Sequence, residues 1–182
     1  IIEGRLYRGS RGAAGEIGHM RLQDGGRLCG CGRYGCLETL ASKTALAKDL
    51  VALAATGKAP VILAEAGTDF SRIKSGLIKK SIKAGETEVI TLVKRFAHFL
   101  GVGMANCVNI FDPDAIVLGG GLVEKLYEDI APLAETSMRN HAQDFMARQT
   151  KVVEASLGDH SVVTGLAALA IEAQEPGIVW NL

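Results

Sequence analysis

A short glycine-rich segment near the N-terminus contains one histidine and three cysteines at spacings typical of a metal site. These residues are His19, Cys29, Cys31 and Cys36, and they include three of the chain's four cysteines. Thiolate and imidazole are the ligands of closed, tetrahedral Zn²⁺ sites of the Cys3His type. Gly30 and Gly32 suit the tight turn that two cysteines one residue apart require. The spacing therefore predicts a structural zinc loop over residues 19–36.

The residues alone leave other interpretations of these cysteines open. An iron–sulfur cluster would take a fourth cysteine, and the remaining one, Cys107, falls in a helical pattern where we expect it to pack in the core. The same residues could also be unliganded thiols beside an unrelated histidine, or two of the three cysteines could form a disulfide. Four cysteines in 182 residues are too few for a disulfide scaffold, so we expect a reducing compartment, the cytoplasm.

Two carboxylates bracket the cysteine-rich segment. Glu16 comes three residues before His19, and Glu38 comes two residues after Cys36. A metal that holds the loop would hold both carboxylates near it, and carboxylates commonly accept hydrogen bonds from sugar hydroxyls. The alternative is a structural role, in which Glu16 pairs with backbone amides and Glu38 lies in the first turn of a helix, where the helix dipole favours an acid.

A run of three glycines follows a short apolar strand further along the chain. The strand is predicted over residues 115–118, and the run is Gly119, Gly120 and Gly121. In α/β folds ligands bind beyond the carboxyl ends of strands, where glycine lets the backbone approach them closely. A tight strand-to-helix turn would need the same residues. No Gly-Lys-Ser/Thr follows, so the run is not a P-loop.

The composition argues against several classes of protein. Lys and Arg together number 20, and so do Asp and Glu. The chain therefore lacks the excess of basic residues that is typical of nucleic-acid-binding proteins. No apolar run approaches the roughly 20 residues that a membrane-spanning helix needs. With 48% hydrophobic residues the chain can bury a core, so we expect a folded domain.

The apolar pattern predicts an α/β organisation, in which a strand, a glycine loop and a helix are followed by another strand and helix. We expect helices over residues 43–55 (capped by Ser42 and ended by Gly57 and Pro60), 69–83, 86–111, 123–141 and 162–173, and strands over 115–118 and 151–155. Residues 1–9 predict a β-hairpin and residues 10–36 an irregular segment, while residues 61–66 fit either a strand or a helix. Residues 175–182 form a tail without a clear pattern.

Three motifs occur in a fixed order along the chain. They are Gly9-x-x-Gly12-x-Ala14-Gly15-Glu16-Ile17-Gly18-His19, then Cys29-x-Cys31-Gly32-x-x-Gly35-Cys36-Leu37-Glu38 with Ser42, and then Ala115-Ile116-Val117-Leu118-Gly119-Gly120-Gly121. Together they resemble the ROK family (repressors, open reading frames and sugar kinases) over about residues 1–173. Leu157-Gly158-Asp159, before a helix of small residues, is similar to the C-terminal part of that family.

The resemblance implies an actin-like ATPase fold with lobes of ribonuclease H type. It implies a structural zinc ion held by His19, Cys29, Cys31 and Cys36, and contacts from Glu16, His19 and Glu38 to sugar hydroxyls. It also implies that Gly119, Gly120 and Gly121 lie beside the adenosine of ATP. One ring nitrogen of His19 would bind zinc and the other would face the sugar, since metal ligation fixes the tautomer and orients the second nitrogen.

Other motifs of the family are missing from this sequence. A kinase of this type has two phosphate loops and a catalytic Asp in an Asn-Asp pair, and none of these occurs here. We therefore expect residues 1–174 to correspond to the C-terminal lobe, with the phosphate-loop lobe absent and no catalytic residue in this chain. Positioning drives phosphoryl transfer, so such a chain alone should be inactive.

The resemblance implies a parent protein that is an ATP-dependent hexose kinase, glucokinase-like, using ATP and Mg²⁺ on a hexose or N-acetylhexosamine. A sugar-responsive transcriptional repressor, which would bind nucleic acid through a preceding helix-turn-helix, is the first alternative. An inactive sugar-binding lobe is the second. A homodimer without membrane contact is the expectation for all three.

Overall fold

The computed structural model describes residues 1–174, which divide into two compact units. The smaller unit contains Ile1–Ile17 and the chain from Ser156 onward, and the larger unit is Gly18–Ala155. The buried residues that form the hydrophobic core all belong to the larger unit. Among the described residues, no helix is long and apolar enough to cross a membrane.

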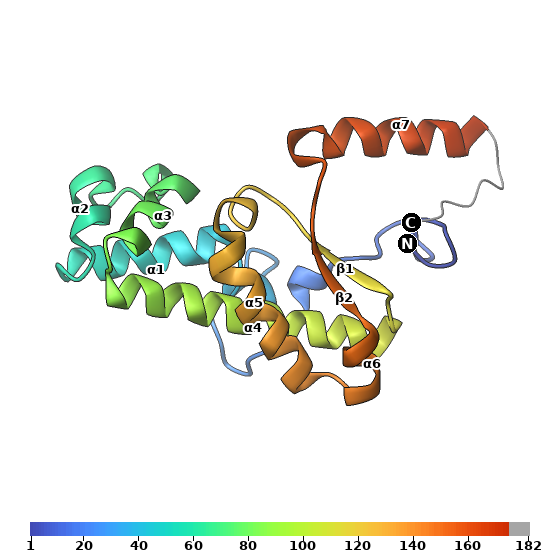
Figure 1. Cartoon of the computed structure of the whole chain (residues 1–182), viewed down its shortest axis with the longest axis horizontal. Helices are drawn as coiled ribbons and strands as arrows, with labels where there is room; N and C mark the ends of the chain where they lie inside the picture. Colours follow the sequence, from blue (N-terminus) through green and yellow to red (C-terminus); the bar gives the residue numbers. More distant parts are fainter. Residues whose placement is uncertain (175–182) are drawn as a thin grey trace. The chain divides into compact units, whose positions relative to one another are not determined.

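Helix α1 (Lys43–Ala55; Figure 1) confirms the predicted helix. Ser42 is its N-cap, as predicted. The Ser42 hydroxyl accepts a hydrogen bond from the amide of Ala45 at 3.1 Å. It thereby satisfies one of the amides that a helix leaves unpaired at its N-terminus. Leu46 and Leu50 are buried, because helical spacing places both on the face that meets the core.

Helices α2 and α3 correct two sequence-based expectations. The segment that fitted either a strand or a helix is helical, as α2 (Pro60–Ala66). Pro60 begins this helix instead of ending α1, since the first position of a helix needs no amide hydrogen. Helix α3 (Ser75–Lys83) is shorter than predicted, because a separate 3₁₀ turn (Phe70–Arg72), capped by the Asp69 carboxylate, precedes it.

Helix α4 (Thr87–Phe111) is the longest element and confirms the predicted long helix. Val89, Val93 and Val108 follow the spacing of one helical face and are buried in the core. The helix ends at Asp112, whose φ of 43° is left-handed, and Pro113 follows, which cannot continue a helix.

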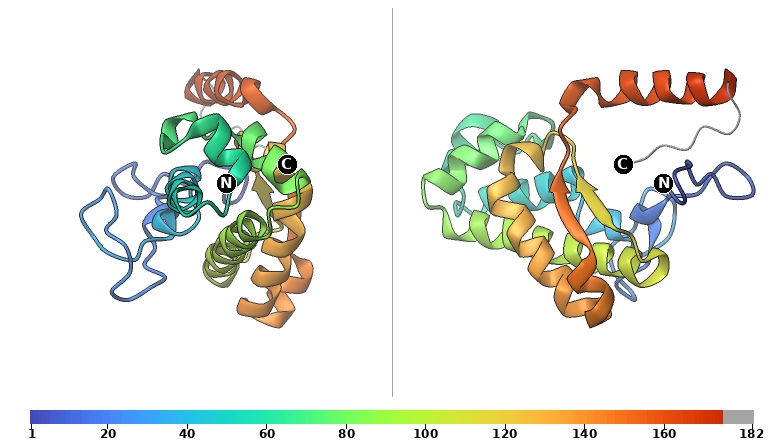
Figure 2. Two further views of the ribbon diagram at one scale, coloured as in Figure 1. Left: turned by 90° about the vertical axis from the view of Figure 1, so that its left-hand side faces the viewer. Right: turned by 45° about the vertical axis from the view of Figure 1, so that its right-hand side comes forward.

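Helix α5 (Tyr127–His141) packs along α4, and the two lie side by side in both views of Figure 2. A Cβ at Gly101 of α4 would lie 2.3 Å from the carbonyl oxygen of Ala134 in α5, so the helices approach more closely than a side chain would allow. The predicted helix over residues 123–141 is interrupted, since a 3₁₀ turn (Glu124–Leu126) precedes α5. The sequence pattern missed α6 (Asp144–Gln149).

The two predicted strands form a parallel two-stranded sheet (Figure 1). Strand β1 (Ala115–Leu118) pairs with β2 (Lys151–Glu154) in register from the first residue to the last. All four residues of β1 are apolar, yet Leu118 is buried while Val117 is 62% exposed. An apolar strand is buried on both faces only where other elements cover both faces of its sheet.

The smaller unit contains helix α7 (Ser161–Gln174), which confirms the predicted C-terminal helix, and a short 3₁₀ turn (Gly158–His160) before it. The predicted N-terminal hairpin is wrong beyond its turn. Ile2 and Arg5 form one antiparallel bridge, and the following residues form no strand. A hairpin of this length is marginal without a third strand or a helix to pack against. The predicted tail lies outside the described residues.

Candidate functional site

Two antiparallel bridges shape the cysteine-rich loop. One joins Arg21 to Cys36, and the other joins Leu28 to Tyr34. The first bridge brings the residues that follow His19 alongside Cys36. The second bridge pairs the residues on either side of Cys29 and Cys31. Residues far apart in the sequence are therefore held together by backbone pairing, before any side chain contributes.

The turn that carries the first two cysteines closes between Cys29 and Gly32. The amide of Gly32 donates a hydrogen bond to the carbonyl of Cys29 at 2.9 Å, and Gly32 has a φ of +82°, which favours glycine. Gly30 was predicted to be needed for the same turn. Its φ is not positive and a Cβ there would meet open space, so that part of the prediction is wrong.

Gly35 lies where the two halves of the loop cross. Its φ is +77°, and its amide donates to the carbonyl of Arg27 at 2.9 Å. Its own carbonyl accepts a hydrogen bond from the amide of Leu22 at 2.9 Å. A Cβ at this position would lie 1.7 Å from the carbonyl oxygen of Gln23. The loop can therefore adopt this path only with glycine at position 35.

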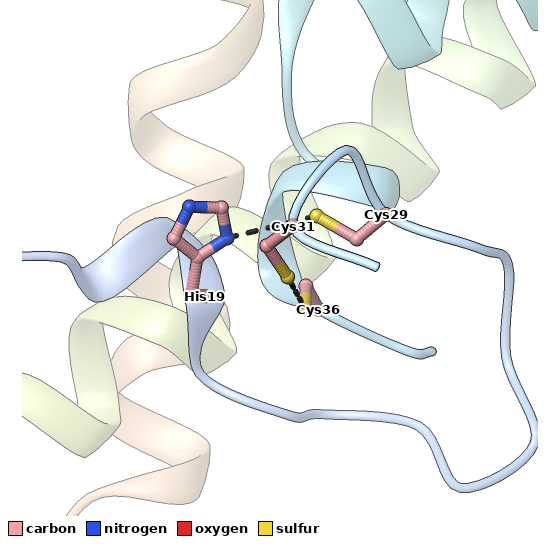
Figure 3. A group of neighbouring side chains, drawn as sticks. All are labelled: His19, Cys29, Cys31 and Cys36. Carbon is pink, nitrogen blue, oxygen red and sulfur yellow. Dashed lines mark hydrogen bonds between the residues drawn. The ribbon is translucent and has the colours of Figure 1, made fainter. Parts of the chain in front are cut away.

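The four predicted ligands converge in one cluster (Figure 3). The Nδ1 atom of His19 lies 3.6 Å from Sγ of Cys29, and the Sγ atoms of Cys31 and Cys36 are 3.8 Å apart. All four ligand atoms lie within 4.8 Å of one another. Around one tetrahedral zinc ion, two sulfurs would be about 3.8 Å apart, and a sulfur and a nitrogen about 3.5 Å. The donor set and its spacing thus fit such an ion.

The three thiols of the cluster differ in environment. Cys29 and Cys36 are buried, and Cys31 is exposed. A hydrogen bond from the backbone of Arg33 lowers the pKa of the Cys31 thiol. Burial, together with the neighbouring thiols, raises the pKa of Cys36 to about 11. Because metal ions bind thiolates, an ion entering the cluster must displace the proton of Cys36.

Glu38 lies at the edge of the cluster, in a 3₁₀ turn (Leu37–Thr39). Its Oε2 atom is 3.5 Å from Sγ of Cys29 and 3.6 Å from Nδ1 of His19. The structure therefore brings Glu38 and His19 together, whereas Glu16 belongs to the smaller unit. The side of the His19 ring that faces the cluster carries Nδ1.

Two hollows adjoin the cluster and add residues that the sequence reasoning missed. Arg33 and Tyr34 line one hollow together with His19. Arg27 and Lys48 line the other together with Glu38. These four side chains follow no motif of their own, and only the folding of the loop places them beside the predicted residues.

The three glycines follow the carboxyl end of β1, as predicted. A Cβ at Gly119 would lie 2.8 Å from Cβ of Ala155, so this position needs glycine for packing. Gly120 has a φ of +93°, and its amide donates to the Glu124 carboxylate at 3.0 Å. A Cβ at Gly121 would meet open space. The first two glycines are thus required by packing and by the turn, and the third has open space beside it.

The ROK family matches residues 1–173. The chain belongs to the ROK family. Among its relatives, a glucokinase of Streptomyces coelicolor is 32% identical over 174 residues, which is 94% of this chain and 55% of that protein. A xylose repressor of Caldicellulosiruptor bescii is 31% identical over 178 residues, covering 94% of this chain and 42% of the repressor.

A solved ROK structure has the same architecture. The ROK family glucokinase from Streptomyces griseus, in complex with glucose and AMPPNP, aligns with a TM-score of 0.77 and 30% identity. The alignment covers 91% of this chain and 54% of that one. The chain thus has the α/β fold of the ROK kinases, and it spans about half the length of the relatives it matches. Kinases and repressors are similar to it at nearly equal identity.

Proposed function

We propose that this chain is the part of a glucokinase-like, ATP-dependent hexose kinase that holds a zinc ion and binds the sugar. The observation that carries the proposal is that His19 and Glu38 lie within 3.6 Å of each other at a cluster of four potential metal ligands, in a member of the ROK family. A metal ion at that cluster would rigidify the loop from which both side chains project.

The proposed metal is zinc, with a structural role. Its ligands are His19, Cys29, Cys31 and Cys36, and four protein ligands leave no position for a reactive water. Chemically, the ion supplies only rigidity and polarisation of the imidazole. Thiolates are soft ligands, which favours zinc over magnesium or calcium.

The proposed sugar ligands are Glu16, His19 and Glu38. The carboxylates accept hydrogen bonds from hydroxyl groups, and Nε2 of His19 pairs with a hydroxyl while Nδ1 faces the metal. These residues bind and orient the sugar. None of them is proposed to remove the proton of the reacting hydroxyl, so the chain contributes positioning to the transfer.

Gly119, Gly120 and Gly121 are proposed to lie beside the adenosine of ATP. The amide of Gly120 is paired with the Glu124 carboxylate, and this negative charge would repel a phosphate group. That arrangement supports an adenosine-side role for the loop over a phosphate-binding one. Phosphate and Mg²⁺ binding would then fall to other parts of the complete protein.

A sugar-responsive repressor is the second candidate, because a xylose repressor is nearly as similar to this chain as a glucokinase is. Both functions would use the same zinc loop and sugar ligands, but a repressor needs no adenosine site. An inactive sugar-binding lobe is the third candidate.

The deciding experiment uses the full-length protein that carries this chain, assayed for glucose-dependent ADP release and for ATP binding. A kinase releases ADP, and Glu38→Gln should lower kcat/KM for glucose at least tenfold while leaving the affinity for ATP unchanged. A protein that binds sugar and operator DNA, and releases no ADP, would be a repressor. For the isolated chain, calorimetry should detect at most weak glucose binding, and submicromolar affinity would contradict the proposal that glucose binding also needs residues outside residues 1–182.

A further inference from the structure

A second group of metal-binding side chains lies on the packed pair of helices, away from the cysteine loop. His98 of α4 and His141 of α5 are both exposed, and their ring centroids are 5.5 Å apart. Buried Ser137 lies between them and contacts both residues. Lys94, Thr136 and other side chains line a hollow around this pair.

The close packing of α4 on α5 holds this pair in place. A Cβ at Gly101, one turn after His98, would lie 2.5 Å from Cβ of Ser137. Glycine therefore lets the two backbones approach until the Ser137 hydroxyl reaches His98. The two imidazoles are thus anchored to neighbouring rigid helices instead of to loops.

The hydrogen bonds around Ser137 determine the tautomer of each ring. The Ser137 hydroxyl donates its single hydrogen to the carbonyl of His98 at 2.8 Å. Nδ1 of His98, 3.2 Å from the same oxygen, must then donate to it. Nδ1 of His141 lies 2.7 Å from the Ser137 carbonyl, which can only accept. In the neutral rings both Nδ1 atoms therefore carry the hydrogen, and both Nε2 atoms keep a lone pair.

We propose that His98 and His141 form a second metal site, which binds a divalent transition-metal ion such as Ni²⁺ or Zn²⁺ through Nε2 of each ring. Two imidazoles bound to one tetrahedral ion have centroids about 5 Å apart, for metal–nitrogen bonds of about 2.0–2.1 Å. The observed 5.5 Å is close to this value. Hydrogen bonds to the second ring nitrogen are also the usual support of metal-binding histidines. Water completes the coordination.

Lys94 carries a positive charge that would repel a cation bound between His98 and His141. It lies one turn before His98 and lines the same hollow. Its flexible chain is exposed, so the ammonium group can turn toward solvent. An anion site would instead depend on this charge. The effect of removing it therefore distinguishes the two kinds of ligand.

The test is a titration of the zinc-loaded chain with Ni²⁺. Calorimetry measures the affinity, and paramagnetic broadening of the histidine NMR signals identifies the residues that bind. The chain is loaded with one equivalent of zinc, which the cysteine cluster takes because it offers four ligands and the histidine pair offers two, so that added Ni²⁺ reports on the second site. The signals of His98 and His141 should broaden first. His98→Ala and His141→Ala should each weaken binding at least tenfold, and Lys94→Met should tighten it roughly threefold by removing a like charge.

Two further variants keep the result interpretable. His160→Ala removes a histidine of the smaller unit and should leave Ni²⁺ affinity unchanged. Ser137→Ala leaves both rings but removes the partner of one Nδ1, and should weaken binding roughly tenfold. Affinity that is unchanged in both His98→Ala and His141→Ala would overturn the proposal. So would broadening by Ni²⁺ that spares these rings while inorganic phosphate shifts their signals in a Lys94-dependent way.

Discussion

The carbonyl oxygen of Gln23 occupies the space where a side chain at position 35 would begin, 1.7 Å from the ideal Cβ of Gly35. The two crossing halves of the cysteine loop therefore approach each other at Gln23 and Gly35 more closely than a side chain would allow. Because Gly35 also has a positive φ, no other residue can follow the same path without strain. The cluster of four potential metal ligands therefore depends on a residue that is not one of them.

Gly35→Ala should disrupt the loop and release the metal. We expect zinc content below half of one equivalent and a loss of about 2–4 kcal/mol in unfolding free energy, from the clash and the strained φ. Elemental analysis and thermal denaturation measure the two effects. Gly30→Ala is the matched control, since its Cβ meets open space, and it should bind a full equivalent. Equal zinc content in both variants would contradict the role of Gly35.

Removal of a ligand should abolish both zinc and sugar binding. Cys31→Ala leaves three donors for a tetrahedral ion, and the loop then loses the constraint that positions His19 and Glu38. The expected result is loss of stoichiometric zinc and at least a tenfold loss of glucose affinity in the full-length protein. Cys107→Ala on α4 is the control and should retain both. Full zinc content and sugar affinity in Cys31→Ala would refute a structural metal.

Zinc affinity should weaken as the pH falls. Thiols must lose their protons to become ligands, so protons compete with zinc, and more of them compete at lower pH. The pKa of Cys36, about 11 without metal, keeps this thiol protonated throughout neutral pH. Zinc binding should therefore release its proton at every pH between about 6 and 8. Calorimetry in buffers of different ionisation enthalpy counts the released protons, and zinc binding without proton release in this range would contradict the raised pKa of Cys36.

Gly101→Ala should separate α4 from α5. Its Cβ would lie 2.3 Å from a backbone carbonyl oxygen, which cannot move without shifting a helix, so we expect a loss of about 2–4 kcal/mol. Gly76→Ala in α3 meets open space and should stabilise the protein by up to about 1 kcal/mol through helix propensity. Chemical denaturation of the pair measures the difference. Equal stability of the two variants would show that the helices are not in close contact at Gly101.

Ser42→Ala should lower the unfolding free energy by about 1 kcal/mol, because it leaves the amide of Ala45 without its partner at the start of α1. Urea denaturation can resolve a change of this size. Ser42→Asp restores an acceptor at the cap and should recover most of the loss. A cost for both substitutions would indicate that Ser42 acts through packing instead.

Several features of this protein follow from residues that are close together in the sequence. The Ser42 cap, the apolar face of α4 and the pairing of one histidine with three cysteines could all be predicted, because each depends on residues close in sequence. The tertiary structure decided features that depend on distant partners. It showed that Gly35 and not Gly30 is required in the loop, since the carbonyl that excludes a side chain comes from Gln23.

The same reason explains the other differences. The exposure of Val117 depends on which elements cover the sheet, and periodicity cannot report that. The pairing of His98 with His141 depends on the close approach of α4 to α5 at Gly101, so each histidine alone gave no sign of the other. The sequence by itself therefore determined which chemical groups are present and which local elements carry them. Only tertiary packing decided which groups meet, because contacts between distant segments depend on the whole path of the chain.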